Sequence, residues 1–317
     1  MSDESKGAVL SALGANLAIA AGKTIAGVIT GSAAMLAEAG HSFADTFNQV
    51  FLLVGIRNSR TAPDARHPHG YGREAFFWSF LVAVTMFTAG AVFALYEGVR
   101  TITGDHDHHR SNSDLMIAFG VLGMAFLFES FSMTVATRTL MREARKKSWS
   151  IRSYLGKSPN LVVKTVFFED AAALLGLIVA AGGIATSELA GTEIWDGVAS
   201  LVIAGLLAVV AFTIGMQSRR LLLAASADEE TDARIREIVS EFPEVQAIVR
   251  MMTTQAGIHS IIVTGELELK RDMRTQEVEV LIGQIDAELS RKLPEVTSTF
   301  WELRRRPIAD VPEPASN

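Results

Sequence analysis

The first two thirds of the chain consist of long apolar stretches separated by short polar segments, and the last third is more polar. A membrane-spanning helix needs about 20 predominantly apolar residues, and six stretches meet that requirement. The predicted spans are Ala8–Thr30, Ala33–Arg57, Glu74–Thr101, Asp114–Arg138, Leu161–Ala185 and Glu193–Gln217. The pattern therefore predicts a six-helix transmembrane domain over residues 1–224.

The pattern changes near Ala225, where charged residues become frequent. Two amphipathic helices and three strands are predicted beyond this point. In chain order these are the helix Asp228–Glu241, the strands Val245–Thr254 and Ser260–Lys270, the helix Thr275–Lys292 and the strand Val296–Arg304. This order fits a small cytoplasmic α+β domain of the ferredoxin-like type, over residues 225–306, with helices on one face of a sheet. The Pro-rich tail, residues 307–317, is predicted to be disordered.

Composition supports a membrane protein and excludes several other classes. Of the 317 residues, 49% are hydrophobic, which is too apolar for an ordinary soluble domain of this size. The net charge of −6 gives no global basic surface for nucleic acid. Without cysteine there is no disulfide, thiolate ligand or cysteine nucleophile. The opening residues have mixed charge and lack a cleavage site, so no removable targeting segment is predicted.

Basic residues indicate the orientation in the membrane. They gather after the second, fourth and sixth predicted helices, and the opposite loops offer few. These residues are Arg57, Arg60, Arg66, Arg73, Arg142, Arg145, Lys146, Lys147, Arg152, Lys157, Arg219 and Arg220. Because cytoplasmic loops carry an excess of Lys and Arg, both termini are predicted to be cytoplasmic.

The second predicted helix contains the polar residues His41 and Asp45 within an apolar stretch. Four residues apart, they lie on one helix face, and Asn48 extends that face by another turn. Ionisable groups at this depth normally face a bundle interior or a water-filled path. Imidazole and carboxylate are also ligands that Zn²⁺, Fe²⁺, Mn²⁺ and Co²⁺ accept. The sequence therefore indicates an intramembrane metal site, with a polar pair that bonds neighbouring helices as the alternative.

Several motifs together resemble the cation diffusion facilitator, or cation efflux, family over nearly the whole chain. They are Gly31-Ser32, the run from His41 to Asp45, the loop Asp64–Arg73 and the segment Glu169–Gly176. The combination is similar to the branch that contains the mitochondrial zinc exporter and its bacterial relatives. The resemblance implies a homodimer in a bacterial inner membrane that exports divalent metal, zinc above all, in exchange for protons by alternating access. It implies neither an enzyme nor a bound cofactor.

Carried over position by position, the transport site comprises His41, Asp45 and Asp170. Most family members have His or Asp four residues before the aspartate that corresponds to Asp170, where this chain has Val166, which cannot bind metal. Glu169 is the candidate for the missing oxygen, although adjacent helical residues point about 100° apart. The alternative is that Glu169 pairs with Lys23 or faces a neighbouring helix.

The loop after the second helix matches a second metal-binding region of some family members. Asp64 and His67 keep the spacing, but Tyr71 stands where those members have a histidine, and His69 could compensate. The alternative is a loop shaped by Gly and Pro whose histidines cap neighbouring helices.

Two further features are weaker candidates for metal binding. The tract Asp105–His109, between the third and fourth helices, is interpreted as a solvated turn rather than a metal site. The only histidine after Ala225 is His259, so dimerisation, rather than metal sensing, is predicted for the C-terminal domain.

Other functions and other metals remain as alternatives. A membrane hydrolase would need an activated water and a general base, and the sequence contains no His-Glu-x-x-His helix. A metal-binding membrane sensor or scaffold that does not transport could share the fold. Imidazole favours Zn²⁺, while the carboxylates leave Mn²⁺, Fe²⁺ and Co²⁺ open as the exported ion.

Overall fold

The computed structural model describes residues 3–104 and 111–304, with side chains from Gly14 onward except Ala15. The tract Asp105–His109 and the tail 307–317 lie outside the described residues. The chain forms two compact units. The first is helical and comprises residues up to Arg60 together with Glu74–Arg219; the second comprises Thr61–Arg73 and the residues from Arg220. The loop that contains Asp64, His67 and His69 thus belongs to the second unit.

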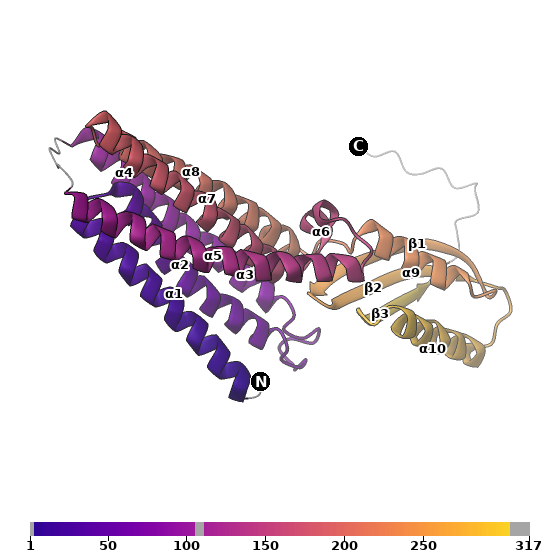
Figure 1. Ribbon diagram of the computed structural model, residues 1–317. Helices are drawn as coiled ribbons and strands as arrows, with labels where there is room; N and C mark the ends of the chain where they lie inside the picture. The colour runs from indigo at the N-terminus through magenta and orange to yellow at the C-terminus, as the bar shows by residue number, and fades with distance from the viewer. Residues whose placement is uncertain (1–2, 105–110, 305–317) are drawn as a thin grey trace, which may run out of the picture. The chain divides into compact units, whose positions relative to one another are not determined.

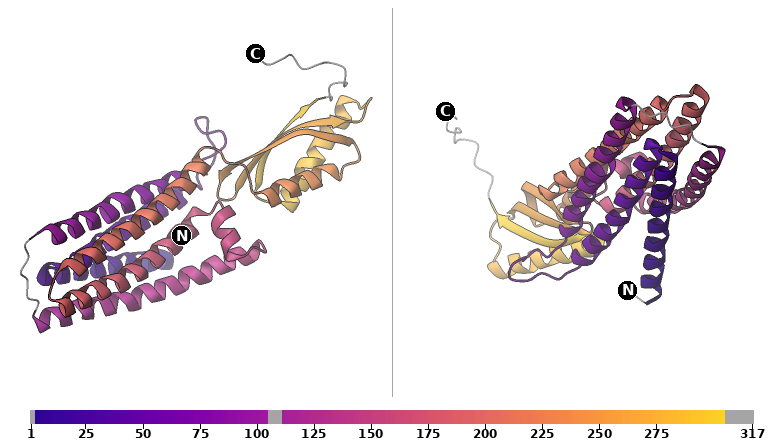
Figure 2. Two further views of the ribbon diagram at one scale, coloured as in Figure 1. Left: turned by 90° about the horizontal axis from the view of Figure 1, so that it is seen from above. Right: turned by 90° about the vertical axis from the view of Figure 1, so that its left-hand side faces the viewer.

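The described helices of the helical unit follow the predicted spans closely (Figure 1). They are α1 (Asp3–Thr30), α2 (Ala33–Asn58), α3 (Glu74–Thr85), η1 (Met86–Val92), α4 (Phe93–Thr103), α5 (Asn112–Lys146), α6 (Ile151–Lys157), α7 (Leu161–Ala190) and α8 (Ile194–Leu222). Helix α2 lies beside α1, α3, α4 and α7, and α5 lies beside α1 and α7. Figure 2 shows the long helices of this unit running alongside one another. Among the described residues, three continuous helices are long and apolar enough to cross a membrane: Glu74–Thr103, Asn112–Lys146 and Ile194–Leu222.

The third predicted helix contains an irregularity that the hydrophobic pattern did not indicate. Its middle part, η1, is a π-helix of seven residues, a rare form that is frequent at functional sites. Gly40 of α2 lies against it, because an added Cβ there would come within 2.6 Å of Phe93 Cδ1 and 3.2 Å of the Ala89 carbonyl oxygen. Glycine therefore allows α2 to approach this segment closely, next to His41.

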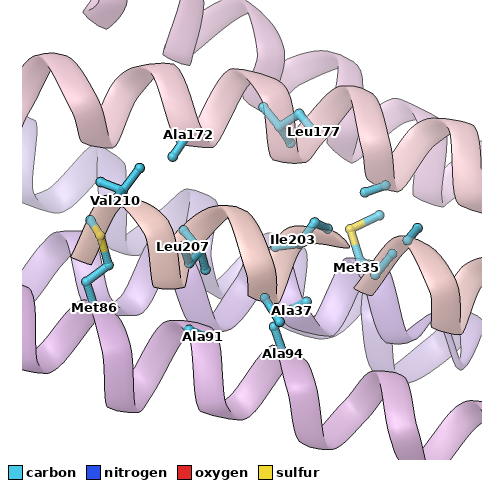
Figure 3. Close-up of a cluster of buried hydrophobic side chains, with 14 of the residues drawn as sticks. Met35, Ala37, Met86, Ala91, Ala94, Ala172, Leu177, Ile203, Leu207 and Val210 are labelled. Carbon is cyan, nitrogen blue, oxygen red and sulfur yellow. The ribbon is translucent and has the colours of Figure 1, made fainter. Parts of the chain in front are cut away.

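The core of the helical unit is built largely from small side chains (Figure 3). Ala37 of α2, Ala91 of η1, Ala94 of α4 and Ala172 of α7 are all buried. Larger side chains, such as Leu207 of α8, fill the space between them. Small residues let helices approach closely in lipid, where packing rather than the hydrophobic effect holds them together.

A buried carboxylate from α8 completes the beginning of α2. Ser32 is the N-cap of α2, and its Oγ accepts a hydrogen bond from the Met35 amide at 3.1 Å. The same hydroxyl donates to Asp196 Oδ1 at 2.8 Å, and the Ala33 amide donates to Asp196 Oδ2 at 2.7 Å. A negative charge is favourable at a helix N-terminus, where free amides and the macrodipole meet. The Gly31-Ser32 motif thus fixes the start of α2 to α8.

The second unit has the predicted order of helix, strand, strand, helix and strand. Its elements are α9 (Glu229–Ser240), β1 (Val245–Gly257), β2 (Ser260–Leu269), α10 (Thr275–Lys292) and β3 (Val296–Leu303). The sheet order is β1-β2-β3; β1 and β2 are antiparallel, and β2 and β3 are parallel. Apolar residues of both helices, including Ile238 and Ile285, form one core with Val263 and Leu267 of β2. A complete ferredoxin-like domain has four strands, and the described residues supply three of them.

Candidate metal centre

Helix α2 brings His41 and Asp45 together inside the helical unit. The His41 side chain is 1% exposed and the Asp45 side chain 14% exposed, and His41 Nδ1 lies 3.4 Å from Asp45 Oδ1. Within the described residues, neither ring nitrogen of His41 has a hydrogen-bond partner, and Asp45 Oδ1 has none either. Buried polar atoms are rarely left unpaired, so these atoms are available to bind a ligand.

Helix α7 places its two adjacent carboxylates against different neighbours. Glu169 Oε1 accepts a hydrogen bond from Asn48 Nδ2 of α2 at 2.7 Å. Asp170 Oδ2 accepts one from Ser132 Oγ of α5 at 2.9 Å. Both carboxylates are buried. Glu169 thus faces the neighbouring helix α2, which is one of the two alternatives that the sequence left open for it.

The other alternative for Glu169, a pairing with Lys23, is wrong. Lys23 of α1 forms its ion pair with Glu38 of α2, with 3.0 Å between Nζ and Oε2, and both side chains are fully buried. Its Nζ also donates to Ser42 Oγ at 2.8 Å. The polar face of α2 therefore begins one turn before His41.

Glu129 of α5, which the sequence motifs did not single out, lies on the helix that donates Ser132 to Asp170. The Glu129 side chain is half-buried. Its signal was present in the sequence, because an ionisable residue inside a predicted membrane span is a functional candidate by default. Helix α7, which packs against both α2 and α5, thus places Glu169 and Asp170 between the helices that carry Asp45 and Glu129.

These side chains do not form a closed coordination shell. Over residues 3–104 and 111–304, no three or more His, Asp or Glu side chains are placed so that they could together hold a metal ion. The described arrangement instead consists of pairs, His41 with Asp45 and Asn48 with Glu169, on facing helices. Binding of one ion by both helices requires side chains or helices to move.

The loop of the second unit uses Asp64 to hold its own backbone. Asp64 Oδ1 accepts hydrogen bonds from the His67 amide at 2.7 Å and the Arg66 amide at 2.9 Å, and Oδ2 accepts one from the Tyr71 hydroxyl at 2.9 Å. These bonds, above all that from His67, lower the pKa of Asp64 below its usual value. Asp64 is therefore a carboxylate that organises a turn, as Asp commonly does.

The two loop histidines point to different partners. His67 Nδ1 lies 3.6 Å from Asp64 Oδ1, and its ring contacts the Tyr71 ring with 4.1 Å between centroids and a tilt of 40° between the planes. His69 instead makes an edge contact with Phe300 of β3 at 6.0 Å between centroids. The loop thus brings Asp64 and His67 together, whereas His69 lies against the sheet.

Comparison with known proteins defines the class of the helical unit. The family model described as the cation efflux transmembrane domain matches residues 9–223. The chain belongs to this family, as the sequence motifs indicated.

Individual relatives extend the comparison beyond the transmembrane domain. The chain is 29% identical over 295 residues to the human mitochondrial proton-coupled zinc antiporter SLC30A9. The aligned region covers 91% of this chain and 51% of the human protein. It is 29% identical to metal tolerance protein C4 of Arabidopsis thaliana, over 86% of this chain and 59% of that protein. It is 22% identical to the manganese efflux system protein MneP of Bacillus subtilis, over 92% of this chain and 93% of that protein. The chain thus spans about half the length of the human relative and nearly all of the bacterial one.

Proposed function

We propose that this chain exports a divalent metal cation, zinc above all, in exchange for protons. The observation that carries the proposal is the buried His41–Asp45 pair, whose ring nitrogens and Oδ1 have no hydrogen-bond partner among the described residues, on the helix whose Asn48 contacts Glu169 of α7. An imidazole and carboxylates provide nitrogen and oxygen ligands that suit Zn²⁺. The human relative is named as a proton-coupled zinc antiporter, which supports this choice of ion.

Proton coupling follows from the ligand chemistry. Metal ligands must be deprotonated to bind, so arrival of the ion expels protons and protonation promotes its release. Histidine changes its charge between pH 5 and 8 when unperturbed, so His41 is the proposed proton carrier. Asp45 and Asp170 supply the negative charge that offsets dehydration of the ion.

The proposed membrane arrangement has six spans with both termini in the cytoplasm. Besides the three helices identified by length and composition, α1, α2 and α7 are proposed to cross the bilayer, shielded by their neighbours where they are polar. The basic segments after α2, α5 and α8 then lie on the cytoplasmic side of a bacterial inner membrane. The second unit is proposed to dimerise in the cytoplasm.

Reconstituted vesicles with an imposed pH gradient test the proposal. In vesicles with an acidic interior, protein whose cytoplasmic side faces outward should take up Zn²⁺. The exchange for protons should make the interior more alkaline, which a trapped pH-sensitive dye reports. A series with Mn²⁺, Fe²⁺ and Co²⁺ as competitors ranks the ions; the name of the Bacillus relative makes Mn²⁺ the main rival. Metal binding without flux would instead support a sensor or scaffold. Uptake that is independent of the gradient would contradict antiport.

The C-terminal part offers a separate prediction. Truncation after about Ser226 should weaken the dimer and lower the transport rate, but leave the order of metal preference unchanged, because the transport ligands lie in the helical unit. It also removes β1 and β3, against which Gly72 and His69 pack. Light scattering and flux with two metals measure these effects.

Truncation after Arg304 is the control, and it should leave both dimer and flux intact. A switch of the preferred metal after the longer truncation would show that the C-terminal part selects the ion.

A further inference from the structure

The ion pair between Lys23 of α1 and Glu38 of α2 is an unusual feature of the helical unit. Both side chains are fully buried, and Lys23 Nζ contacts Glu38 Oε2 at 3.0 Å and Ser42 Oγ at 2.8 Å. Burial of two charges costs desolvation energy that their attraction often fails to recover, so a buried pair is weak evidence for a stabilising role. Ionisable residues within membrane segments are instead candidates for function.

Glu38 is placed where it could bind the transported ion. It precedes His41 by three residues and Asp45 by seven, so the three side chains lie along one face of α2. Among the described residues, Glu38 Oε1 has no hydrogen-bond partner. This oxygen contacts the position that a Cβ would occupy at Gly176 of α7. One oxygen of Glu38 is therefore held by Lys23, and the other is buried and directed at the helix that carries Glu169.

Lys23 lies close to the proposed transport site. Its ammonium group contacts Glu38 and Ser42, and Ser42 directly follows His41 in α2. An ammonium group held in this position neutralises the negative charge of one carboxylate permanently. The carboxylate that it contacts is Glu38.

We propose that Lys23 determines metal specificity by keeping Glu38 out of the transport site, an inference that rests on the function proposed above. While Lys23 neutralises Glu38, the ion meets the imidazole of His41 and the remaining carboxylates. Without that charge, Glu38 becomes an additional oxygen ligand one turn from His41. Oxygen ligands suit Mn²⁺, whereas imidazole suits Zn²⁺. Loss of Lys23 therefore shifts the preference of the site from Zn²⁺ towards Mn²⁺.

Calorimetric titration of the full-length protein in nanodiscs with Zn²⁺ and with Mn²⁺ tests this inference. Lys23→Met should raise the affinity for Mn²⁺ relative to Zn²⁺ about tenfold or more, the scale on which partners of metal ligands act. The double variant Lys23→Met/Glu38→Gln should restore the wild-type ratio, because the released carboxylate is then absent. Glu38→Gln alone should leave the ratio unchanged.

Each outcome decides the question. An unchanged ratio in folded Lys23→Met, or a double variant that keeps the shifted ratio, would overturn the inference. Lys23→Gln keeps a donor for Ser42 without the charge, and it replaces Lys23→Met if that variant fails to insert. Loss of Zn²⁺ binding in folded Glu38→Gln would show that Glu38 is already a ligand and would also overturn it.

Failure of the proposed function has a different signature. In that case the wild-type protein binds neither metal, or Asp45→Asn binds both as the wild type does. Failure of the Lys23 inference alone leaves wild-type binding and its dependence on Asp45 intact.

Discussion

Asp45→Asn is expected to abolish metal flux while the protein still inserts and dimerises. The Asp45 side chain is mostly buried next to His41, with an oxygen that has no hydrogen-bond partner among the described residues. An amide has nearly the same shape but no charge, so the substitution removes charge compensation for a divalent ion without leaving a cavity. The loss should exceed the roughly 10–100-fold effect typical of groups that only support a metal ligand.

The measurement is initial Zn²⁺ flux into vesicles at matched protein content. Glu97→Gln is a suitable control, because Glu97 is also a buried carboxylate of the helical unit but is paired with Arg100 on α4, at 3.7 Å. It should retain most of the flux. Wild-type rates in Asp45→Asn would remove Asp45 from the proposed transport site.

The two carboxylates of α7 are expected to differ in their contribution to metal binding. Asp170→Ala should eliminate high-affinity binding, because it removes the α7 carboxylate in the register that the family resemblance assigns to a ligand. Glu169→Ala should weaken binding by ~10–100-fold, as expected for a supporting group. Its Oε1 already accepts a hydrogen bond from Asn48.

Val166→His provides an internal check on this register. Position 166 lies four residues before Asp170, on the same face of α7. An imidazole there should partly restore metal binding in Glu169→Ala, for Zn²⁺ more than for Mn²⁺. Titration of the three variants with both metals measures the set. If Glu169→Ala binds no metal and Asp170→Ala binds normally, Glu169 is the ligand, and its bond to Asn48 directs it towards α2.

The sequence predicted the elements of the fold well because their signals are local. Long apolar stretches define the helices, and the alternating residues of β2, such as Val263 and Leu267, define a strand with one buried face. The π-helical segment η1 and the seven-residue helix α6 were not predicted. The first is as apolar as the helices on either side, so the hydrophobic pattern does not distinguish it, and the second is too short to show periodicity.

The candidate site was predictable only within each helix. The spacing of His41 and Asp45 placed both on one face of α2, and the structure has them 3.4 Å apart. Which helices face each other is a tertiary property, so the contact between Asn48 and Glu169, 121 residues apart, could not be obtained from spacing. For the same reason the sequence did not identify Glu38 as the partner of Lys23.

The cap of α2 has a consequence for the order of biosynthesis. Ser32 and Asp196 are separated by 164 residues. At ~5–20 residues per second, a ribosome completes Asp196 roughly 8–33 s after Ser32. Throughout that interval the nascent α2 lacks the carboxylate that accepts from its first amide and its N-cap hydroxyl. The helix that carries His41 and Asp45 is thus among the first to be synthesised, but its N-terminus is completed only when α8 emerges.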